Sequence, residues 1–170
     1  MKINLTSKEK SLLKDQKSHE EICVQKYTYY ANAASDPQLK ALFNNHAQTE
    51  QEHLNTINQL LNGEIPDLNQ QQGNAGANQQ PLQGYQQEQA NIFPLTNNPA
   101  PNVNNQSADK NLCADLLMTE KYVSGTYDTA IFEFRDPQVR DTLNHIQKEE
   151  QKHGEAIFNY MESKGMYSPQ

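Results

Sequence analysis

The sequence has no tryptophan, only two cysteines and no long apolar run. Cys23 and Cys113 are too few for a disulfide framework, and without a Cys-x-x-Cys pair the chain cannot hold iron through four thiolates. We expect both thiols to be small buried apolar groups. Because no window approaches the roughly eighteen apolar residues of a membrane-spanning helix, we expect no transmembrane segment.

Positive charge is scarce as well. The 14 lysines and arginines are outnumbered by 21 aspartates and glutamates, which gives a formal net charge of -7, and no basic run occurs. Nucleic acids and anionic membranes are therefore not expected as partners. The first ten residues, MKINLTSKEK, contain no apolar stretch after the basic residue, so we expect cytoplasmic synthesis without a signal peptide.

A length of 170 residues suits one domain, which we expect to span residues 1–170. Only 35% of the residues are hydrophobic and the mean hydropathy is -0.95, which is too polar for a chain that is compact throughout. The excess of polar residues lies in residues 64–107, where nearly half the residues are asparagine or glutamine. We predict a disordered or loosely packed linker there, and a role of this segment in self-association stays open.

The two arms on either side of the linker are copies of one another. When the chain is shifted by one hundred residues, positions 7–61 align with positions 107–161 without a gap and share fourteen identities. A match of this extent is typical of an internal duplication, so we predict that the chain contains the same structural unit twice.

Each copy is interrupted by an aspartate followed by a proline, at Asp36-Pro37 and at Asp136-Pro137. An N-cap aspartate before proline ends one helix and starts the next, so each arm is predicted to be a helical hairpin. The four predicted helices span residues 7–34, 37–62, 108–134 and 137–164, and the two hairpins span residues 7–63 and 108–165.

Four helices of this kind form a bundle, and each is about 40 Å long at 1.5 Å per residue. Two hairpins related by a two-fold axis place the second and third helices parallel, which requires a connection as long as the bundle. The linker over residues 64–107 is long enough for this crossover. We therefore predict an all-α, up-down four-helix bundle with a long crossover between helices 2 and 3.

Glu50 and His53 lie about one turn apart on a predicted helix, so both side chains project from the same face. A single Glu-x-x-His pattern is weak evidence for a metal site, because chance produces it often in a glutamate-rich helix. The duplication retains this pattern, however, while many surface positions diverge. The ligand-type positions retained are Glu20, Glu50 and His53 in the first copy, and Glu120, Glu150 and His153 in the second.

Four glutamates that face one core need compensation for their charge, and two divalent cations would supply it. A glutamate from each of two helices, with a Glu-x-x-His from each of the other two, is the ligand set of the ferritin-like di-iron carboxylate bundles. The first arm, with ExxxxxxYTYYA starting at Glu20 and with Phe43 before the Glu-x-x-His, resembles the first hairpin of the rubrerythrin branch. This resemblance implies a ferritin-like fold.

A second resemblance involves the other arm. The segment DPQVRDTLNHIQKEEQKHGEAIFNYM, the closing Gly165-Met166-Tyr167 and the central Gln/Asn-rich insertion resemble clostridial members of the spore coat protein F family. This implies a protein of sporulating cells, located in or near the spore coat, with other coat proteins or further copies of itself, including a homodimer, as partners. Many members of that family have no evident metal ligands, whereas this sequence retains all six.

The ferritin-like ligand set assigns a role to each residue. In this ligand set, the carboxylates that bridge the two metals are those of Glu50 and Glu150. The terminal carboxylates, which bind one metal each, are those of Glu20 and Glu120. Each metal also receives one imidazole, from His53 or from His153. Oxygen and imidazole ligands suit iron or manganese, with zinc as an adventitious occupant. Such a dinuclear centre would reduce dioxygen or peroxide by two electrons.

Several other side chains lie near these ligands in sequence. Tyr27 and Tyr127 lie two turns from the terminal glutamates, where they would hydrogen-bond to ligand carboxylates or fill the core. His46 faces inward and is predicted to be a polar core histidine or to support a ligand, rather than to be a seventh ligand. The side chains predicted to face away from the site are His19, Glu21, Glu52, His145 and Glu149.

Three functional hypotheses follow from these patterns. The first is a spore coat component that binds a dinuclear metal centre. The second is a rubrerythrin-like di-iron peroxidase or oxidase, although Val123 stands where rubrerythrins commonly have an extra carboxylate. The third is a metal-free interaction module in which the ligand pattern is a relic.

Overall fold

The computed structural model describes residues 2–66 and 103–168, and this part of the chain is built from four helices. Most of the predicted linker therefore lies outside the described residues. The helices are α1 (Ser7–Ala33), α2 (Pro37–Leu61), α5 (Val103–Ile131) and α6 (Pro137–Ser163). The predicted boundaries of α1, α2 and α6 agree with the structure to within one residue.

The prediction for the third helix is wrong at both ends, because α5 begins at Val103 rather than at 108 and ends at Ile131 rather than at 134. Near its start, the Gln106 side chain donates a hydrogen bond to the carbonyl oxygen of Lys164 at 3.1 Å, which joins α5 to the end of α6. At its end, the Phe134 backbone N–H donates to the carbonyl of Ile131, a turn bond that lies outside the helix.

The helix starts follow from the capping residues. Thr6 and Glu9 form a capping box at the start of α1. The carboxylates of Asp36 and Asp136 each accept a hydrogen bond at 2.8 Å from the backbone N–H two residues later. Gly63 has a φ of 82°, in the left-handed region that suits the residue after a helix end.

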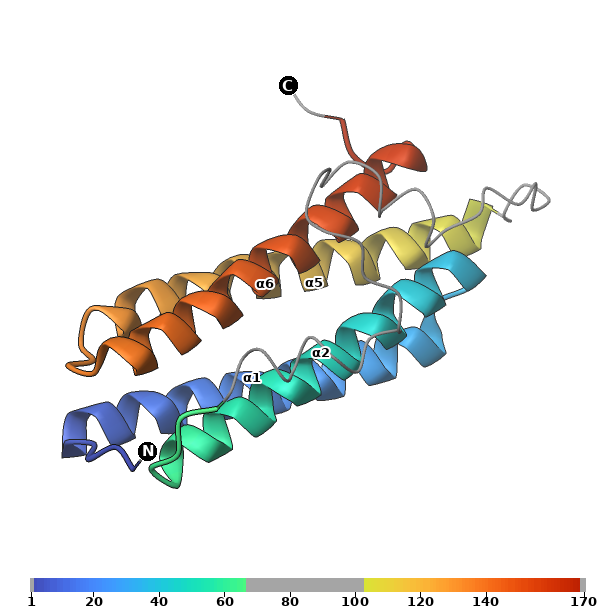
Figure 1. Cartoon of the computed structure of the whole chain (residues 1–170). Coiled ribbons are helices and arrows are strands. Elements are labelled where there is room, and N and C mark those ends of the chain that lie inside the picture. Colours follow the sequence, from blue (N-terminus) through green and yellow to red (C-terminus); the bar gives the residue numbers. More distant parts are fainter. Residues whose placement is uncertain (1, 67–102, 169–170) are drawn as a thin grey trace, which may run out of the picture.

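The four helices form two antiparallel pairs, α1 with α2 and α5 with α6 (Figure 1). The pairs lie side by side, so that α1 contacts α5 and α2 contacts α6. Because α2 and α5 run in the same direction, the chain must cross the length of the bundle between them (Figure 1). The predicted all-α bundle is confirmed. Within the described part of the chain, no helix has both the length and the apolar character needed to cross a bilayer.

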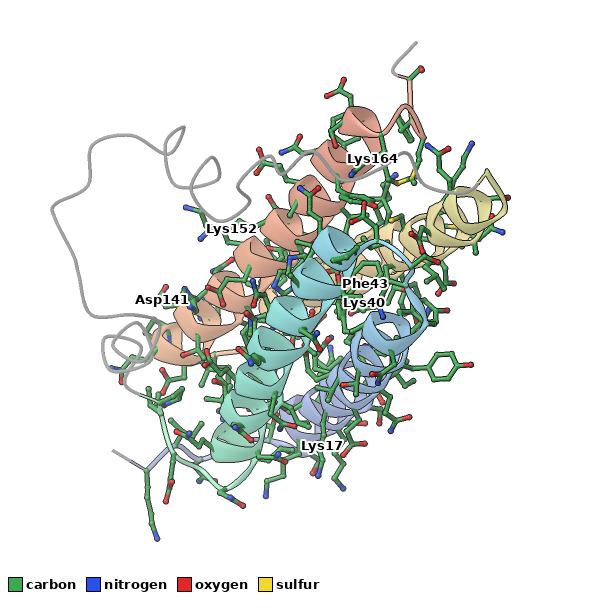
Figure 2. The ribbon with its side chains drawn as sticks, turned by 90° about the vertical axis from the view of Figure 1, so that its right-hand side faces the viewer. Lys17, Lys40, Phe43, Asp141, Lys152 and Lys164 are labelled. Carbon is green, nitrogen blue, oxygen red and sulfur yellow. The ribbon has the colours of Figure 1, made fainter. Side chains whose placement is uncertain are left out.

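The core consists of two apolar clusters with a polar layer between them. The first cluster includes Leu13, Ile57 and Leu143, and the second includes Leu39 and Phe43. Charged side chains such as those of Lys40 and Lys152 lie on the outside of the bundle (Figure 2). Both cysteines are free and buried, which confirms the expectation for them.

Candidate metal centre

The polar layer between the two apolar clusters is made by the middle of all four helices. α1 and α5 each contribute one glutamate, while α2 and α6 each contribute a glutamate and a histidine one turn later. The structure brings all six predicted ligands together in this layer, and none of them is more than 5% exposed. They are Glu20, Glu50, His53, Glu120, Glu150 and His153.

The six side chains form two overlapping groups of four, and within each group the candidate ligand atoms all lie within 4.8 Å of one another. One group consists of Glu20, Glu50, His53 and Glu150, and the other of Glu50, Glu120, Glu150 and His153. Glu50 and Glu150 belong to both groups, and bridging carboxylates would occupy this position. The remaining glutamate and histidine of each group belong to one side only.

The Nδ1 atoms of the two histidines face the carboxylates. His53 Nδ1 lies 3.0 Å from Glu150 Oε1, 3.4 Å from Glu50 Oε2 and 3.7 Å from Glu20 Oε2. His53 Nδ1 makes no hydrogen bond of good geometry with any of these three oxygens. His153 Nδ1 lies 2.8 Å from Glu50 Oε1, close enough for a hydrogen bond. Each imidazole thus presents one nitrogen to the same small space as several carboxylate oxygens.

Most of the carboxylate oxygens in this layer lack a hydrogen-bond donor from the protein. Among the described residues, five buried oxygens have no hydrogen-bond donor, and they are Glu20 Oε2, Glu50 Oε2, Glu120 Oε2, Glu150 Oε1 and Glu150 Oε2. A buried acceptor without a donor costs about 1–3 kcal/mol, and more when the group is charged. Divalent cations would satisfy these oxygens and balance the four carboxylates, so the residues present fit a dinuclear centre.

The surroundings raise the pKa of three of the four glutamates and lower the pKa of the fourth. Burial raises the pKa of Glu20 and of Glu150 to about 7. Burial and the adjacent Glu150 also raise the pKa of Glu120 well above its usual value. Burial acts in the same direction on Glu50, but the hydrogen bonds and charges of His153 and His53 outweigh it and lower the pKa of Glu50. Protons therefore compete with a cation for three of the four carboxylates.

Two tyrosines donate hydrogen bonds to the buried glutamates of the opposite hairpin, on α1 and α5. The Tyr27 hydroxyl on α1 donates a hydrogen bond to Glu120 Oε1 on α5. The Tyr127 hydroxyl on α5 donates to Glu20 Oε1 on α1. Burial and the carboxylates raise the pKa of both tyrosines well above the usual value, so each remains a donor. The two bonds form a reciprocal pair across the α1–α5 contact.

Comparison with known proteins is informative for only one of the hairpins. No curated protein and no solved structure is similar enough to the chain to match it. A family model does match part of it. Residues 108–170 match the Coat F domain. This match supports the predicted resemblance to the spore coat protein F family.

The Coat F domain match contains half of the candidate metal centre. Glu120, Glu150 and His153 lie within it, as does Tyr127. The other half comes from the first hairpin, which is related to the Coat F segment by the internal duplication. The residues of the candidate centre therefore come from both copies.

His46 lies in the polar layer but in neither group of four. Its ring stacks on that of His153 with centroids 4.1 Å apart, and the Tyr27 ring meets it edge-on at 5.2 Å. Burial, together with the charge of His153, lowers the pKa of His46 well below its usual value. His46 is thus a neutral ring stacked on a candidate ligand, and its role as a support for that ligand stays a prediction.

The sequence missed one side chain that contacts a candidate ligand. Glu149 is predicted to face outward, but its Oε2 atom lies 2.8 Å from His53 Nε2 and its side chain is only 26% exposed. The prediction is wrong because Glu149 reaches across from α6 to a histidine on α2. By contrast, Glu21 and Glu52 are exposed, as predicted.

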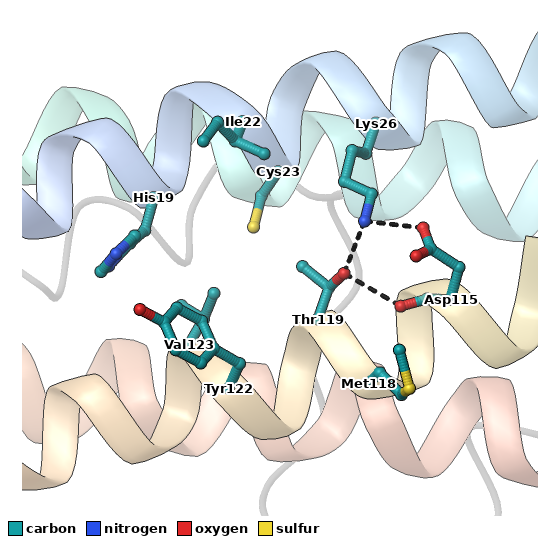
Figure 3. Close-up of a pocket in the computed structure, with 9 residues that line it drawn as sticks. All are labelled: His19, Ile22, Cys23, Lys26, Asp115, Met118, Thr119, Tyr122 and Val123. Carbon is teal, nitrogen blue, oxygen red and sulfur yellow. Dashed lines mark hydrogen bonds and ion pairs between the residues drawn. The ribbon is translucent and has the colours of Figure 1, made fainter.

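A groove between α1 and α5 lies next to the polar layer (Figure 3). Its lining includes the buried Cys23 and Val123 together with the exposed side chains of Ile22, Met118 and Tyr122. Burial and the charges of all four glutamates raise the pKa of Cys23, so its thiol is protonated. Cys23 is thus an apolar group that adjoins both the groove and the carboxylates.

Proposed function

We propose that this chain is a spore coat component whose helical bundle binds a dinuclear iron or manganese centre. The Coat F domain match supports the spore coat assignment. The metal assignment depends on one observation, which is that five buried carboxylate oxygens without donors face two imidazole Nδ1 atoms in the middle of the bundle. Such a group costs the fold free energy unless a cation binds it.

In this proposal the two ions share Glu50 and Glu150. Glu20 and His53 complete the ligands on one side, and Glu120 and His153 complete them on the other. Carboxylate and imidazole donors suit iron and manganese, and zinc would bind adventitiously. Tyr27 and Tyr127 orient the terminal carboxylates, which leaves one oxygen of each free for a cation.

The experiment that tests the metal assignment is thermal unfolding of the full chain with Mn(II), with Fe(II) under anaerobic conditions, and with a chelator. A cation at one hundred times its dissociation constant adds about 2.7 kcal/mol to the free energy of unfolding, which raises the midpoint by several degrees. We expect this rise in the wild type and in the control variant Glu52→Ala, whose side chain is exposed on the same helix. We expect none in Glu50→Ala. Equal midpoints with metal and with chelator would contradict the proposal.

A second candidate function is a rubrerythrin-like peroxidase or oxidase, and the groove favours it because Cys23, which lines the groove, also lies close enough to all four glutamates for their charges to raise its pKa. Two bound ferrous ions would supply two electrons for the reduction of dioxygen or peroxide. Cys23 and Val123 would limit the access of water from the groove. Val123 also leaves this chain without the extra carboxylate that rubrerythrins commonly have at that position.

Peroxide consumption by ferrous-loaded protein separates the two functions. The enzyme hypothesis expects rapid consumption by the wild type and by Glu52→Ala, and much slower consumption by Glu50→Ala. If the three proteins consume peroxide at the same rate while only Glu50→Ala fails to bind metal, the centre is structural. Iron or manganese in protein purified from its own host would identify the native metal.

A further inference from the structure

The two candidate imidazole ligands are held in different ways. His53 directs Nδ1 toward the carboxylates, while its other nitrogen, Nε2, lies 2.8 Å from Glu149 Oε2. Glu149 comes from α6, in the opposite hairpin, so this contact also joins the two copies. A carboxylate therefore contacts the ring on the side away from the candidate metal.

The duplicated positions on the other side are occupied by different residues. The equivalent of Glu149 is Thr49, whose hydroxyl donates at 3.4 Å to the carbonyl oxygen of Asn45 on its own helix. His153 instead stacks on the His46 ring at a centroid distance of 4.1 Å. Near the shared glutamates, the ligands have been kept while the side chains that support the two imidazoles have diverged.

These two supports have different chemical effects. A carboxylate that accepts the Nε2–H proton fixes the tautomer, so the lone pair of Nδ1 points toward the candidate metal. It also makes the imidazole a better donor, and loss of such a partner typically lowers metal affinity 10- to 100-fold. A stacked ring such as His46 fixes the orientation of His153 but accepts no proton from it within the stack.

We propose that Glu149 is a positioning residue for His53 and makes the His53 side of the centre the tighter of two inequivalent metal sites. This inference depends on the proposed metal centre. The two ions then bind in order, the first beside Glu20 and His53 and the second beside Glu120 and His153.

The test is the binding of Mn(II) to chelator-treated full-length protein, followed by the electron paramagnetic resonance signal of free Mn(II). We expect two classes of site in the wild type, one ion in each. Glu149→Gln removes the charge but keeps the shape, and we expect it to weaken the tight class 10- to 100-fold and to leave the weak class unchanged. Glu155→Gln, at an exposed position of the same helix, is the matched control and should bind as the wild type does.

A second variant tests the same idea in the opposite direction. Thr49→Glu places a carboxylate at the duplicated position on α2, and we expect it to tighten only the weak class. A general defect in folding would weaken both classes together, so a change confined to one class is the diagnostic result. Far-ultraviolet circular dichroism confirms that each variant keeps its helices.

Four results would overturn the inference. Two equal classes in the wild type, or a tight class that survives in Glu149→Gln, would overturn the role of Glu149 and leave the metal centre standing. Equal weakening of both classes in Glu149→Gln would do the same. No binding of Mn(II) by the wild type, in an experiment that includes a protein known to bind Mn(II), would overturn the proposed centre itself and the inference with it.

Discussion

The α1–α2 hairpin and the α5–α6 hairpin are most alike at their second-helix starts and in the polar layer, and they differ most in what surrounds that layer. Asp36 and Asp136 make the same 2.8 Å capping bond. By contrast, His46 corresponds to Ile146 and Thr49 to Glu149. In the proposed metal centre, a residue that balances the charge of an ion has few substitutes, whereas a residue that supports a ligand has several. The two copies share the buried glutamates and histidines of the candidate centre and differ in the side chains that contact them.

The largest effect that can sharpen this comparison is expected in the apolar clusters. Phe43 and Leu143 are duplicated positions, both are fully buried, and each lies in a different cluster. We expect Phe43→Ala to lower the free energy of unfolding by about 3–5 kcal/mol and Leu143→Ala by about 2–5 kcal/mol, because each leaves a cavity. Urea unfolding measures both, with the exposed Lys40→Ala as control. A loss no larger than that of the control in either variant would contradict the core described for that hairpin.

A smaller effect is expected from the pH dependence of the metal-free protein. The pKa of Glu20 and of Glu150 is about 7 in the folded protein, above the ordinary value of 4.5, so the folded state binds more protons between these values. The free energy of unfolding should therefore fall as pH rises from about 4.5 to about 7, by on the order of 3 kcal/mol for each fully titrated group. Burial lowers the pKa of His53, but Glu149 and the three glutamates that face its Nδ1 atom outweigh burial and raise it well above 6.5, so His53 adds to this fall above pH 6.5.

Variants that replace the duplicated glutamates Glu20 and Glu120 by neutral residues compare how much each hairpin contributes to this pH dependence. Glu20→Gln and Glu120→Gln should each reduce the loss of stability between pH 5 and pH 8 in the presence of a chelator, because neither amide can be ionised. Glu52→Gln, on the surface, should leave it unchanged. Urea unfolding at the two pH values provides the measurement. If the wild type and the three variants show the same pH dependence, folding does not raise the pKa of Glu20 or of Glu120.

The smallest effect concerns the two capping aspartates. Asp36 also accepts a hydrogen bond from the Tyr160 hydroxyl at 3.0 Å and pairs with Lys164 at 2.8 Å. In the described part of the chain, the Asp136 carboxylate accepts the capping bond from the Gln138 N–H. We expect Asp36→Ala to cost about 2 kcal/mol and Asp136→Ala about 1 kcal/mol in thermal unfolding. Equal losses would show that the contacts to Tyr160 and Lys164 contribute little.

Most of the fold could be predicted because its boundaries depend on local chemistry. The Asp-Pro pairs and the glycine after α2 act through the backbone of the helix that they cap. The start of α5 could not be predicted in this way, because residues 103–107 share the composition of the linker. The helix there is joined to the end of α6 through Gln106 and Lys164, which are far apart in the sequence.

The candidate site was predictable for a related reason. Spacing within one helix indicates which side chains share a face, and the duplication distinguishes Glu50 and His53 from chance patterns. Glu149 was assigned to the wrong environment because its partner, His53, lies on a neighbouring helix. The rotation of α6 against α2 is set by packing, and no spacing within either helix encodes it.

The reciprocal bonds from Tyr27 to Glu120 and from Tyr127 to Glu20 have a consequence for how the gene could evolve. After a duplication, one copy is usually free to decay while the other keeps the activity. Here a tyrosine of each copy orients a glutamate of the other copy, so neither hairpin can be lost without affecting the other. A mutation that disrupts one hairpin would also disturb the buried glutamate of its partner hairpin. Selection would therefore act on the two copies together.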